Sequence, residues 1–283
     1  MVHYQKRTAE VLDAFMNAFT PLDASVDTLA KPRFLDVGCG DGSFTLNFLL
    51  PRCLHQCQKL VAIDNSAVRL DAARQRNGHE KIDYLHLDVV DGDVDEFVKE
   101  HGTFARVYCF NLLPWVKDTA QAMKNIEKLT APGGECFVVF EHCIALFEVY
   151  MALAESAQWK KYSEVRMHVV VVLLLLEKVP NSARSTDMGF MRSHLLSILN
   201  ETELKPLACE VLRLPVVNIP NLKDASDRSV PHNPIYPYLN DEEKKELAKS
   251  TADIFAARAE AIAEGRISNY RFTYVIHAWK PDA

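Results

Sequence analysis

Short apolar segments alternate with helix-length amphipathic segments between residues 31 and 140. The apolar segments are rich in Val, Ile, Leu and Phe, residue types that favour strands. Regular alternation of strand and helix is typical of βαβ units and predicts a parallel sheet. The predicted strands cover residues 33–37, 59–63, 82–87, 105–110 and 135–140.

Polar and conformationally special residues mark where the intervening helices begin and end. Ser66 and Asp118 can accept hydrogen bonds from a first helical turn, so both are predicted N-caps. The Pro-Gly-Gly triplet at 132–134 is predicted to end the fourth helix and to turn the chain into the fifth strand. The helices are expected to open near Ser43, Ser66, Asp93 and Asp118.

The pattern changes after residue 140. Residues 141–186 combine two predicted helices with an eight-residue apolar run at 169–176, and we interpret them as an insertion. A proline-rich loop follows at 216–238, too long to be a simple connection. Asn240 and Glu243 resemble a capping box. The remaining predicted elements are a helix at 187–200, a strand at 206–215, a helix from 241 to 265 and a strand at 270–280, the two strands forming an antiparallel edge.

The composition is that of an ordinary globular protein. Of 283 residues, 48% are hydrophobic and 25% charged, and the formal net charge of -6 gives no indication of nucleic-acid binding. The N-terminus contains no apolar signal segment, so the cytoplasm is the expected location. The run at 169–176 is far shorter than the roughly 20 residues that cross a bilayer, so no stable membrane insertion is expected.

The seven cysteines are expected to be reduced thiols, because their number is odd and most fall inside apolar runs. Cys53 and Cys57 are four residues apart, but no second Cys or His pair stands at zinc-finger spacing. No metal site is therefore predicted.

The clearest chemical signal is an apolar strand that runs into Gly38, Gly40 and Gly42 before a helix. Glycines at alternate positions let the backbone turn sharply and approach a ligand closely, because no Cβ intervenes. The position between a strand and a helix is the context in which such loops bind ligands.

Acidic residues follow the next two strands. Asp64 ends the second strand and Asp88 the third, and the carboxyl ends of parallel strands line one crevice. Asp64 is placed to accept hydrogen bonds from both hydroxyls of a ribose. Asp88 can reach an adenine amino group, with Leu87 and Val89 beside the ring. The predicted ligand is an adenosine without a phosphate.

Each acid also has a purely structural interpretation. Asp64 can cap the helix that begins at Ser66, and Asp88 can cap the turn at Asp91 and Gly92. Either acid taken alone fits both interpretations. Three sites on three successive strand ends favour the functional one.

The glycine and acidic sites together resemble those of the class I S-adenosylmethionine (SAM)-dependent methyltransferases, whose glycine motif this chain matches in full up to Gly42. A nicotinamide enzyme is disfavoured, because its third glycine comes one residue later and Asp41 would repel a phosphate. The resemblance implies SAM as cofactor. It also implies a Rossmann-like α/β fold with a mostly parallel seven-stranded sheet, an antiparallel last strand and helical insertions. The cofactor-binding candidates are Asp36, Gly38, Cys39, Gly40, Asp64, Asn65, Asp88, Val89 and Asn111.

A narrower resemblance, over most of the chain, is to the arthropod juvenile hormone acid O-methyltransferase family. It rests on residues 5–7, 40–43, 115–118, 125–126, 147–150 and 233–234. In that family a glutamine of the N-terminal segment and the tryptophan after the fourth strand hold the substrate carboxylate, which implies these roles for Gln5 and Trp115. The sequence departs from the family at Pro114, where a histidine is usual, and in its apolar run at 169–176. Both departures bear on which acid is bound.

This resemblance implies methyl transfer from SAM to the carboxylate of an apolar isoprenoid or fatty acid, giving a methyl ester. The small acid is the expected partner molecule, and the oligomeric state stays open, a homodimer included. Methylation of an amine or phenol is an alternative that needs a base such as Glu141 or His142. Another is a SAM-binding partner protein without catalysis. His142 is kept as a candidate catalytic or substrate-contacting residue, although a lone histidine beside an apolar segment is more often structural.

The whole chain, residues 1–283, is expected to form a single domain. Its predicted parts are a helical cap at 1–30, a SAM-binding core at 31–140, helical insertions over the acceptor site at 141–186 and 216–265, and closing strands at 206–215 and 270–280.

Overall fold

The computed structural model describes the greater part of the chain and divides it into two compact units. The first comprises Met1–Phe140, Gly189–Val211 and Tyr274–Ala283, and the second Glu141–Met188 and Leu212–Thr273. The insertions predicted at 141–186 and 216–265 lie within the second unit. The described residues are 2–20, 32–53, 55–141, 152–153, 156–162, 187–215, 227, 229–233, 235–266 and 270–282.

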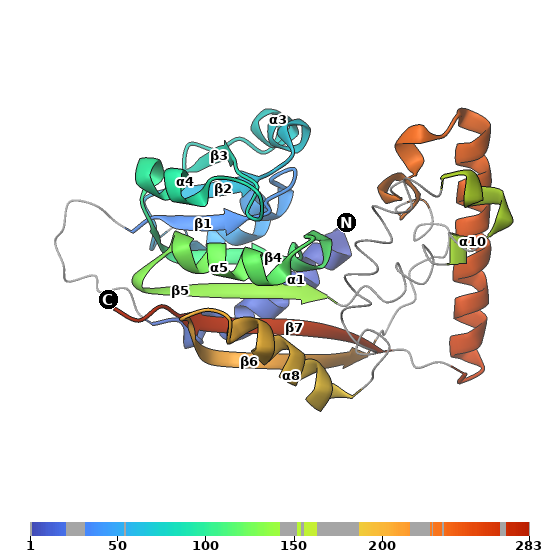
Figure 1. Cartoon of the computed structure of the whole chain (residues 1–283). Coiled ribbons are helices and arrows are strands. Elements are labelled where there is room, and N and C mark those ends of the chain that lie inside the picture. The colour runs from blue at the N-terminus through green and yellow to red at the C-terminus, as the bar shows by residue number, and fades with distance from the viewer. Residues whose placement is uncertain are drawn as a thin grey trace. The chain divides into compact units, whose positions relative to one another are not determined.

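A seven-stranded sheet has the order β3-β2-β1-β4-β5-β7-β6 (Figure 1). Strands β1 to β5 pair in parallel, with Val37 opposite both Ile63 and Cys109. The five predicted strands are confirmed, the first four to within one residue at each end. The strands are β1 (Phe34–Val37), β2 (Leu60–Asp64), β3 (Ile82–His86), β4 (Phe104–Phe110), β5 (Thr130–Glu141), β6 (Lys205–Pro215) and β7 (Tyr270–Trp279).

The start of the fifth strand differs from the prediction. Helix α5 (Thr119–Leu129) ends before the Pro-Gly-Gly triplet, and β5 already pairs with β4 at Thr130. The register then shifts, so the triplet forms a bulge inside β5. Lys280 holds this bulge, because its carbonyl accepts the N–H of Gly133 and its N–H donates to the carbonyl of Gly134, both at 2.9 Å. This pairing makes β7 antiparallel to β5, as predicted.

Side-chain caps open the helices at the predicted positions. Ser66, Asp93 and Asp118 each accept a hydrogen bond from the backbone N–H three residues further on. The helix predicted near Ser43 winds as a π-helical turn over Thr45–Leu49 before α2 (Leu50–Cys53). The other helices around the sheet are α1 (Val2–Phe15), α3 (Ala67–Arg76), α4 (Val94–His101) and α8 (Met188–Leu199).

The segment after α1 is anchored to the sheet by apolar and polar contacts. The ring of Phe19 lies 5.4 Å from that of Phe137 and 4.5 Å from that of His277. Beside these rings, His277 and Glu135 form a buried pair at 2.5 Å, and the N–H of Thr20 donates to the same carboxylate at 2.8 Å. These contacts fix the C-terminal end of the N-terminal segment against the core.

The second unit contains the long helix α10 (Asp241–Ala263), which begins with the predicted capping box of Asn240 and Glu243. An apolar cluster in this unit includes Leu153, Trp159, Val230, Ile235, Leu239 and Leu247. The helix ends two residues before Gly265, where it was predicted to end. None of the helices in the described part of the chain combines the length and apolar character needed to cross a membrane.

Candidate cofactor site and acceptor residues

Three left-handed residues give the glycine loop its shape. Gly38, Gly40 and Gly42 have φ values of 79°, 59° and 73°, which residues with a Cβ rarely adopt. The N–H groups of Gly38 and Cys39 donate to the carbonyl of Ile63 at 2.8 and 2.9 Å. The loop is therefore fixed to the carboxyl end of β2.

The three glycines differ in what surrounds them. A Cβ at Gly42 would clash with the hydroxyl oxygen of Tyr84, and one at Gly38 would lie 3.0 Å from the side chain of Leu112. At Gly40, no atom among the described residues lies within 4 Å of such a Cβ. Packing therefore excludes a Cβ at position 42 and disfavours one at position 38, whereas the open space at Gly40 allows a ligand to approach the backbone.

Asp36 and Cys39 are buried at the base of this loop, with 2% and 7% of their surfaces exposed. The Thr45 hydroxyl donates to Oδ2 of Asp36 at 2.7 Å. Burial raises the pKa of Asp36 to about 7, although the Thr45 hydrogen bond acts to lower it, and the charge of Asp64 adds to the rise. Burial also raises the pKa of the Cys39 thiol. The structure places both side chains within the protein, and their contact with a cofactor stays a prediction.

Asp64, at the end of β2, joins the glycine loop to the start of α3. Its Oδ2 accepts the N–H of Gly40 and its Oδ1 accepts the N–H of Ser66, both at 2.9 Å. The structural interpretation of this acid is thus realised. A carboxylate has about four acceptor directions, so Asp64 retains the capacity to bind ribose hydroxyls as well.

Residues 88–92, which we call the 88–92 turn, follow β3. Oδ1 of Asp88 accepts the N–H of Val90 at 2.8 Å and that of Asp91 at 3.1 Å, and Asn65 donates to Oδ2 at 2.9 Å. Burial acts to raise the pKa of Asp88, but these hydrogen bonds and a nearby lysine charge outweigh burial and lower the pKa. Asp88 is therefore ionised and already oriented at neutral pH.

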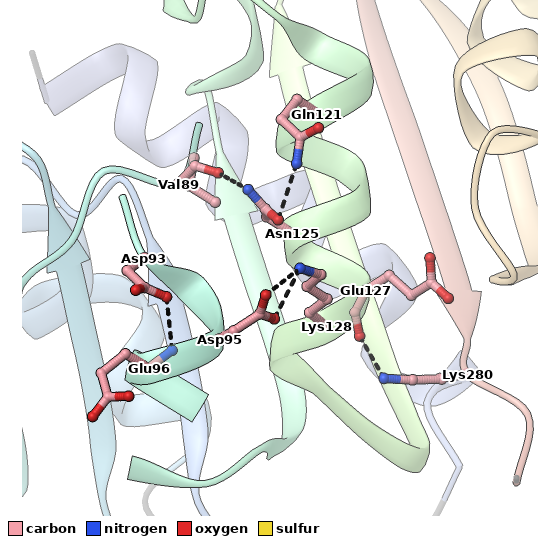
Figure 2. A network of polar contacts seen from close by, with 9 residues as sticks. All are labelled: Val89, Asp93, Asp95, Glu96, Gln121, Asn125, Glu127, Lys128 and Lys280. Atoms are coloured by element: carbon pink, nitrogen blue, oxygen red, sulfur yellow. Dashed lines mark hydrogen bonds and ion pairs between the residues drawn. The ribbon is translucent and has the colours of Figure 1, made fainter. Parts of the chain in front are cut away.

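A buried amide on α5 also holds this turn. Asn125 is 3% exposed and donates Nδ2 to the carbonyl of Val89 at 2.7 Å, while Gln121 donates to Oδ1 of Asn125 at 3.2 Å (Figure 2). No chemical role was predicted for Asn125 from the sequence. The signal that could have revealed one is an amide on an otherwise apolar buried helix face, formed by Ala122, Met123, Ile126 and Leu129.

Helix α1 contacts two of the predicted site segments. Gln5 donates Nε2 to the hydroxyl of Ser43, at the end of the glycine loop, at 2.7 Å. One turn later on α1, the hydroxyl of Thr8 accepts a hydrogen bond from the side chain of Asn111 at 3.2 Å. Asn111 has a φ of 57°, a left-handed value that no other non-glycine residue in the described part of the chain has. Such strained residues cluster at functional sites.

The other acceptor-binding candidates are less fully described. Trp115 ends a 3-10 turn over Leu113–Trp115, and 44% of its surface is exposed. Its contact with a substrate carboxylate stays a prediction. His142 and the apolar run at 169–176 lie outside the described residues, so the structure does not test them.

The fold and the glycine loop define a class of protein. Residues 35–138 match the sequence model of the methyltransferase domain family. The sheet is the mostly parallel seven-stranded sheet of the Rossmann-like methyltransferase fold, so the predicted fold class is confirmed. The match to this domain family also confirms the predicted cofactor, S-adenosylmethionine.

Curated relatives match a little under half of the chain. Juvenile hormone acid O-methyltransferase from Bombyx mori is 30% identical over 134 residues, which are 47% of this chain and 46% of that protein. Ubiquinone biosynthesis O-methyltransferase from Aromatoleum aromaticum is 29% identical over 134 residues, 46% of this chain and 52% of that protein. The chain thus spans about half the length of these relatives. The match to the Bombyx protein is also shorter than the resemblance over most of the chain that the motifs indicated.

Solved structures align over nearly the whole chain at low identity. A Galdieria sulphuraria protein assigned as a sarcosine dimethylglycine methyltransferase covers 98% of this chain and 86% of its own, with a TM-score of 0.53 and 11% identity. SpnF, a cyclase, covers 98% of this chain and 83% of its own, with a TM-score of 0.52 and 16% identity. These similarities show the fold alone, and the fold does not fix the reaction.

Proposed function

We propose that this protein transfers a methyl group from SAM to the carboxylate of an apolar isoprenoid or fatty acid, giving a methyl ester. The observation that carries the proposal is the position of Gln5, whose carboxamide lies 2.7 Å from Ser43 at the end of the glycine loop. This places a neutral hydrogen-bond donor next to the glycine loop, where the cofactor is proposed to bind. The name of the Bombyx relative, a juvenile hormone acid O-methyltransferase, supports a carboxylic acid as the acceptor.

In the proposed complex, the open side of Gly40 receives the cofactor, Asp64 accepts hydrogen bonds from the ribose hydroxyls, and Asp88 accepts one from the adenine amino group. Asp88 suits this role because hydrogen bonds from its own turn keep it ionised and oriented. When bound, SAM would supply a methyl group on a sulfonium, with the neutral thioether S-adenosylhomocysteine as the leaving group. The chain's own residues supply alignment and shield the reaction from water.

The acceptor needs no protein base under this proposal. A simple carboxylic acid has a pKa near 4 to 5, so it is already an anion at pH 7. Neutral donors such as a carboxamide and an indole N–H can orient one oxygen without quenching the charge of the anion. Gln5 and Trp115 are the residues we assign to this task, and no proton transfer is assigned to His142.

Incubation with SAM and a panel of fatty acids, isoprenoid acids, amines and phenols tests the substrate class, with mass detection of a 14-dalton gain. We expect the gain on apolar acids, with a rate that stays nearly flat between pH 6.5 and 9. A rate that rises tenfold per pH unit, with products from phenols only, would reject the acid in favour of phenol methylation, which needs a base. Phenol methylation is kept in the panel because the chain also matches a ubiquinone biosynthesis O-methyltransferase.

The two acceptor residues give a more specific prediction. Gln5→Ala and Trp115→Ala should each lower kcat/KM by roughly 10- to 1000-fold, about 1.4 to 4 kcal/mol, because each removes a donor that orients the carboxylate. The Kd of SAM, measured by calorimetry, should change little. Equal losses of SAM affinity and kcat/KM in both variants would show that these residues support the cofactor instead of the acid.

A further inference from the structure

One peptide unit of the 88–92 turn is bonded at both ends. The carbonyl of Val89 accepts the amide N–H of Asn125 at 2.7 Å, and the next N–H, of Val90, donates to Oδ1 of Asp88 at 2.8 Å. The plane that contains this carbonyl and this N–H is rigid. The orientation of the Asn125 amide therefore fixes the Val89–Val90 peptide plane, and that plane carries the N–H that holds the Asp88 carboxylate.

Asn125 is well placed to set that orientation. It lies on α5 among residues with no exposed surface, including Met123 and Ile126, so its backbone cannot shift without disturbing the core. Gln121, one turn earlier, donates to Oδ1 of Asn125 and thereby fixes which end of the amide faces the turn (Figure 2). The NH₂ group of the Asn125 amide, and not its oxygen, therefore faces the Val89 carbonyl.

We propose that Asn125 is a positioning residue for recognition of the adenine base. This inference rests on the proposed adenine contact of Asp88 and extends it. An anionic, correctly aimed Asp88 accepts a hydrogen bond from the 6-amino group of adenine and repels the 6-carbonyl group of hypoxanthine. Asn125 supports this discrimination from α5 without touching the base itself.

A purely structural role for Asn125 makes a different prediction. A buried amide that only satisfies a carbonyl would contribute to stability, and its loss would lower the melting temperature without changing base preference. The two roles are therefore separated by the ratio of two dissociation constants, not by stability or activity alone.

The experiment compares S-adenosylhomocysteine with S-inosylhomocysteine, which carries hypoxanthine, by calorimetry on the full chain. We expect the wild-type protein to bind the adenine compound at least tenfold more tightly. Asn125→Leu, which is close in size but cannot donate, should reduce this ratio at least threefold. It should also raise the KM for SAM while leaving kcat within about twofold.

Three further variants sharpen the result. Asn125→Asp keeps the size of the side chain but turns an acceptor toward the Val89 carbonyl, so it should reduce the ratio at least as much as leucine does. Gln121→Ala releases the orienting hydrogen bond and should reduce the ratio less. Lys128→Ala is the matched control on the same helix, because Lys128 pairs with the exposed Asp95 (Figure 2) and should leave the ratio unchanged.

Each outcome decides the inference. A wild-type ratio in folded Asn125→Leu and Asn125→Asp proteins would overturn it, as would an equal reduction in Lys128→Ala. If Asn125→Leu does not fold, Asn125→Asp and Gln121→Ala carry the same test. If the wild-type protein binds neither compound, both the inference and the proposed function fail. Binding of both compounds with equal affinity rejects the inference alone.

Discussion

Gly40 and Gly102 both have a positive φ but differ in their surroundings in the sequence. Their φ values are 59° and 72°, with a ψ of -175° at Gly102, and both have space for a Cβ among the described residues. Only Gly40 belongs to the glycine loop, whereas Gly102 ends α4. Alanine substitutions at the two positions therefore distinguish two effects. Both would carry the cost of a Cβ at a positive φ, and only the one at Gly40 would place a Cβ beside the ligand.

We predict that Gly40→Ala and Gly102→Ala each lower the free energy of unfolding, by about 1 to 3 kcal/mol, because each places a Cβ at a positive φ that residues with a side chain rarely adopt. Only Gly40→Ala should weaken S-adenosylhomocysteine binding, by tenfold or more, since its methyl group enters the space open to the ligand. Urea unfolding and calorimetry measure the two effects. Equal affinities in the two variants would place the ligand elsewhere.

Asp36 gives a prediction about pH. Its folded pKa is raised to about 7 by burial, against about 3.9 in an unfolded chain, so the folded state holds the proton more tightly. The free energy of unfolding should therefore fall as pH rises from about 4 to 7. Asn at this position keeps an acceptor for Thr45 and does not ionise.

Asp36→Asn should accordingly lose this part of the pH dependence and be more stable than the wild type at pH 8, by on the order of 2 to 4 kcal/mol. The two proteins should be nearly equal at pH 4. Urea unfolding at both pH values measures the difference. A variant that is less stable than the wild type at pH 8 would mean that the ionised carboxylate gains more from its hydrogen bonds than burial costs it.

The end of helix α5 depends on a residue far away in the sequence. The ammonium group of Lys280, beyond β7, donates to the carbonyls of Glu127 and Thr130 at 2.8 and 2.9 Å (Figure 2 shows the first bond). These carbonyls lie at the C-terminal end of the helix, where the helix dipole favours a positive charge. One side chain therefore closes the helix that carries Asn125.

Lys280→Met should lower the free energy of unfolding by about 1 to 3 kcal/mol, because it removes two hydrogen bonds from a charged donor and keeps most of the side-chain volume. Lys128→Met, which loses only an exposed ion pair with Asp95, should change it by no more than about 0.5 kcal/mol. Denaturant unfolding of both variants tests the difference. Similar losses of unfolding free energy in the two variants would show that Lys280 does not cap α5.

Local signals predicted most of the elements, and long-range pairing decided the exceptions. Ser66 and Asp118 act as caps through bonds within one helical turn, so the sequence nearby was sufficient. The bulge at 131–134 depends on hydrogen bonds to Lys280, which local sequence could not reveal. The same holds for the site: the glycine loop was visible as a motif, but the contact of Asn125 with Val89 depends on how α5 packs.

The first of the two units contains the glycine loop, Asp64 and the 88–92 turn. The prediction that the insertions at 141–186 and 216–265 cover the acceptor site, chiefly through residues 142–180 and 216–238, concerns the second unit and stays a prediction. The acceptor should therefore affect segments of the second unit that the cofactor alone does not affect.

Hydrogen exchange measured in two steps tests this separation. S-adenosylhomocysteine alone should slow exchange at residues 38–42 and 88–92, because binding stabilises the state that holds the ligand. Adding an apolar acid should then slow exchange at 142–180, 216–238 or both. If the acid changes exchange only in the glycine loop, the predicted cover over the acceptor is rejected.

Because Cys39 is buried, the reactivity of its thiol reports how often the glycine loop opens. Thiol reagents attack the thiolate, and Cys39 is a buried thiol with a raised pKa, so it reacts only when the loop opens. The other described cysteines are also buried. The rate at which a small alkylating reagent modifies Cys39, followed by mass spectrometry, therefore counts loop openings in the natural protein without any introduced label. A bound cofactor should lower this rate of Cys39 modification, because the loop then opens less often.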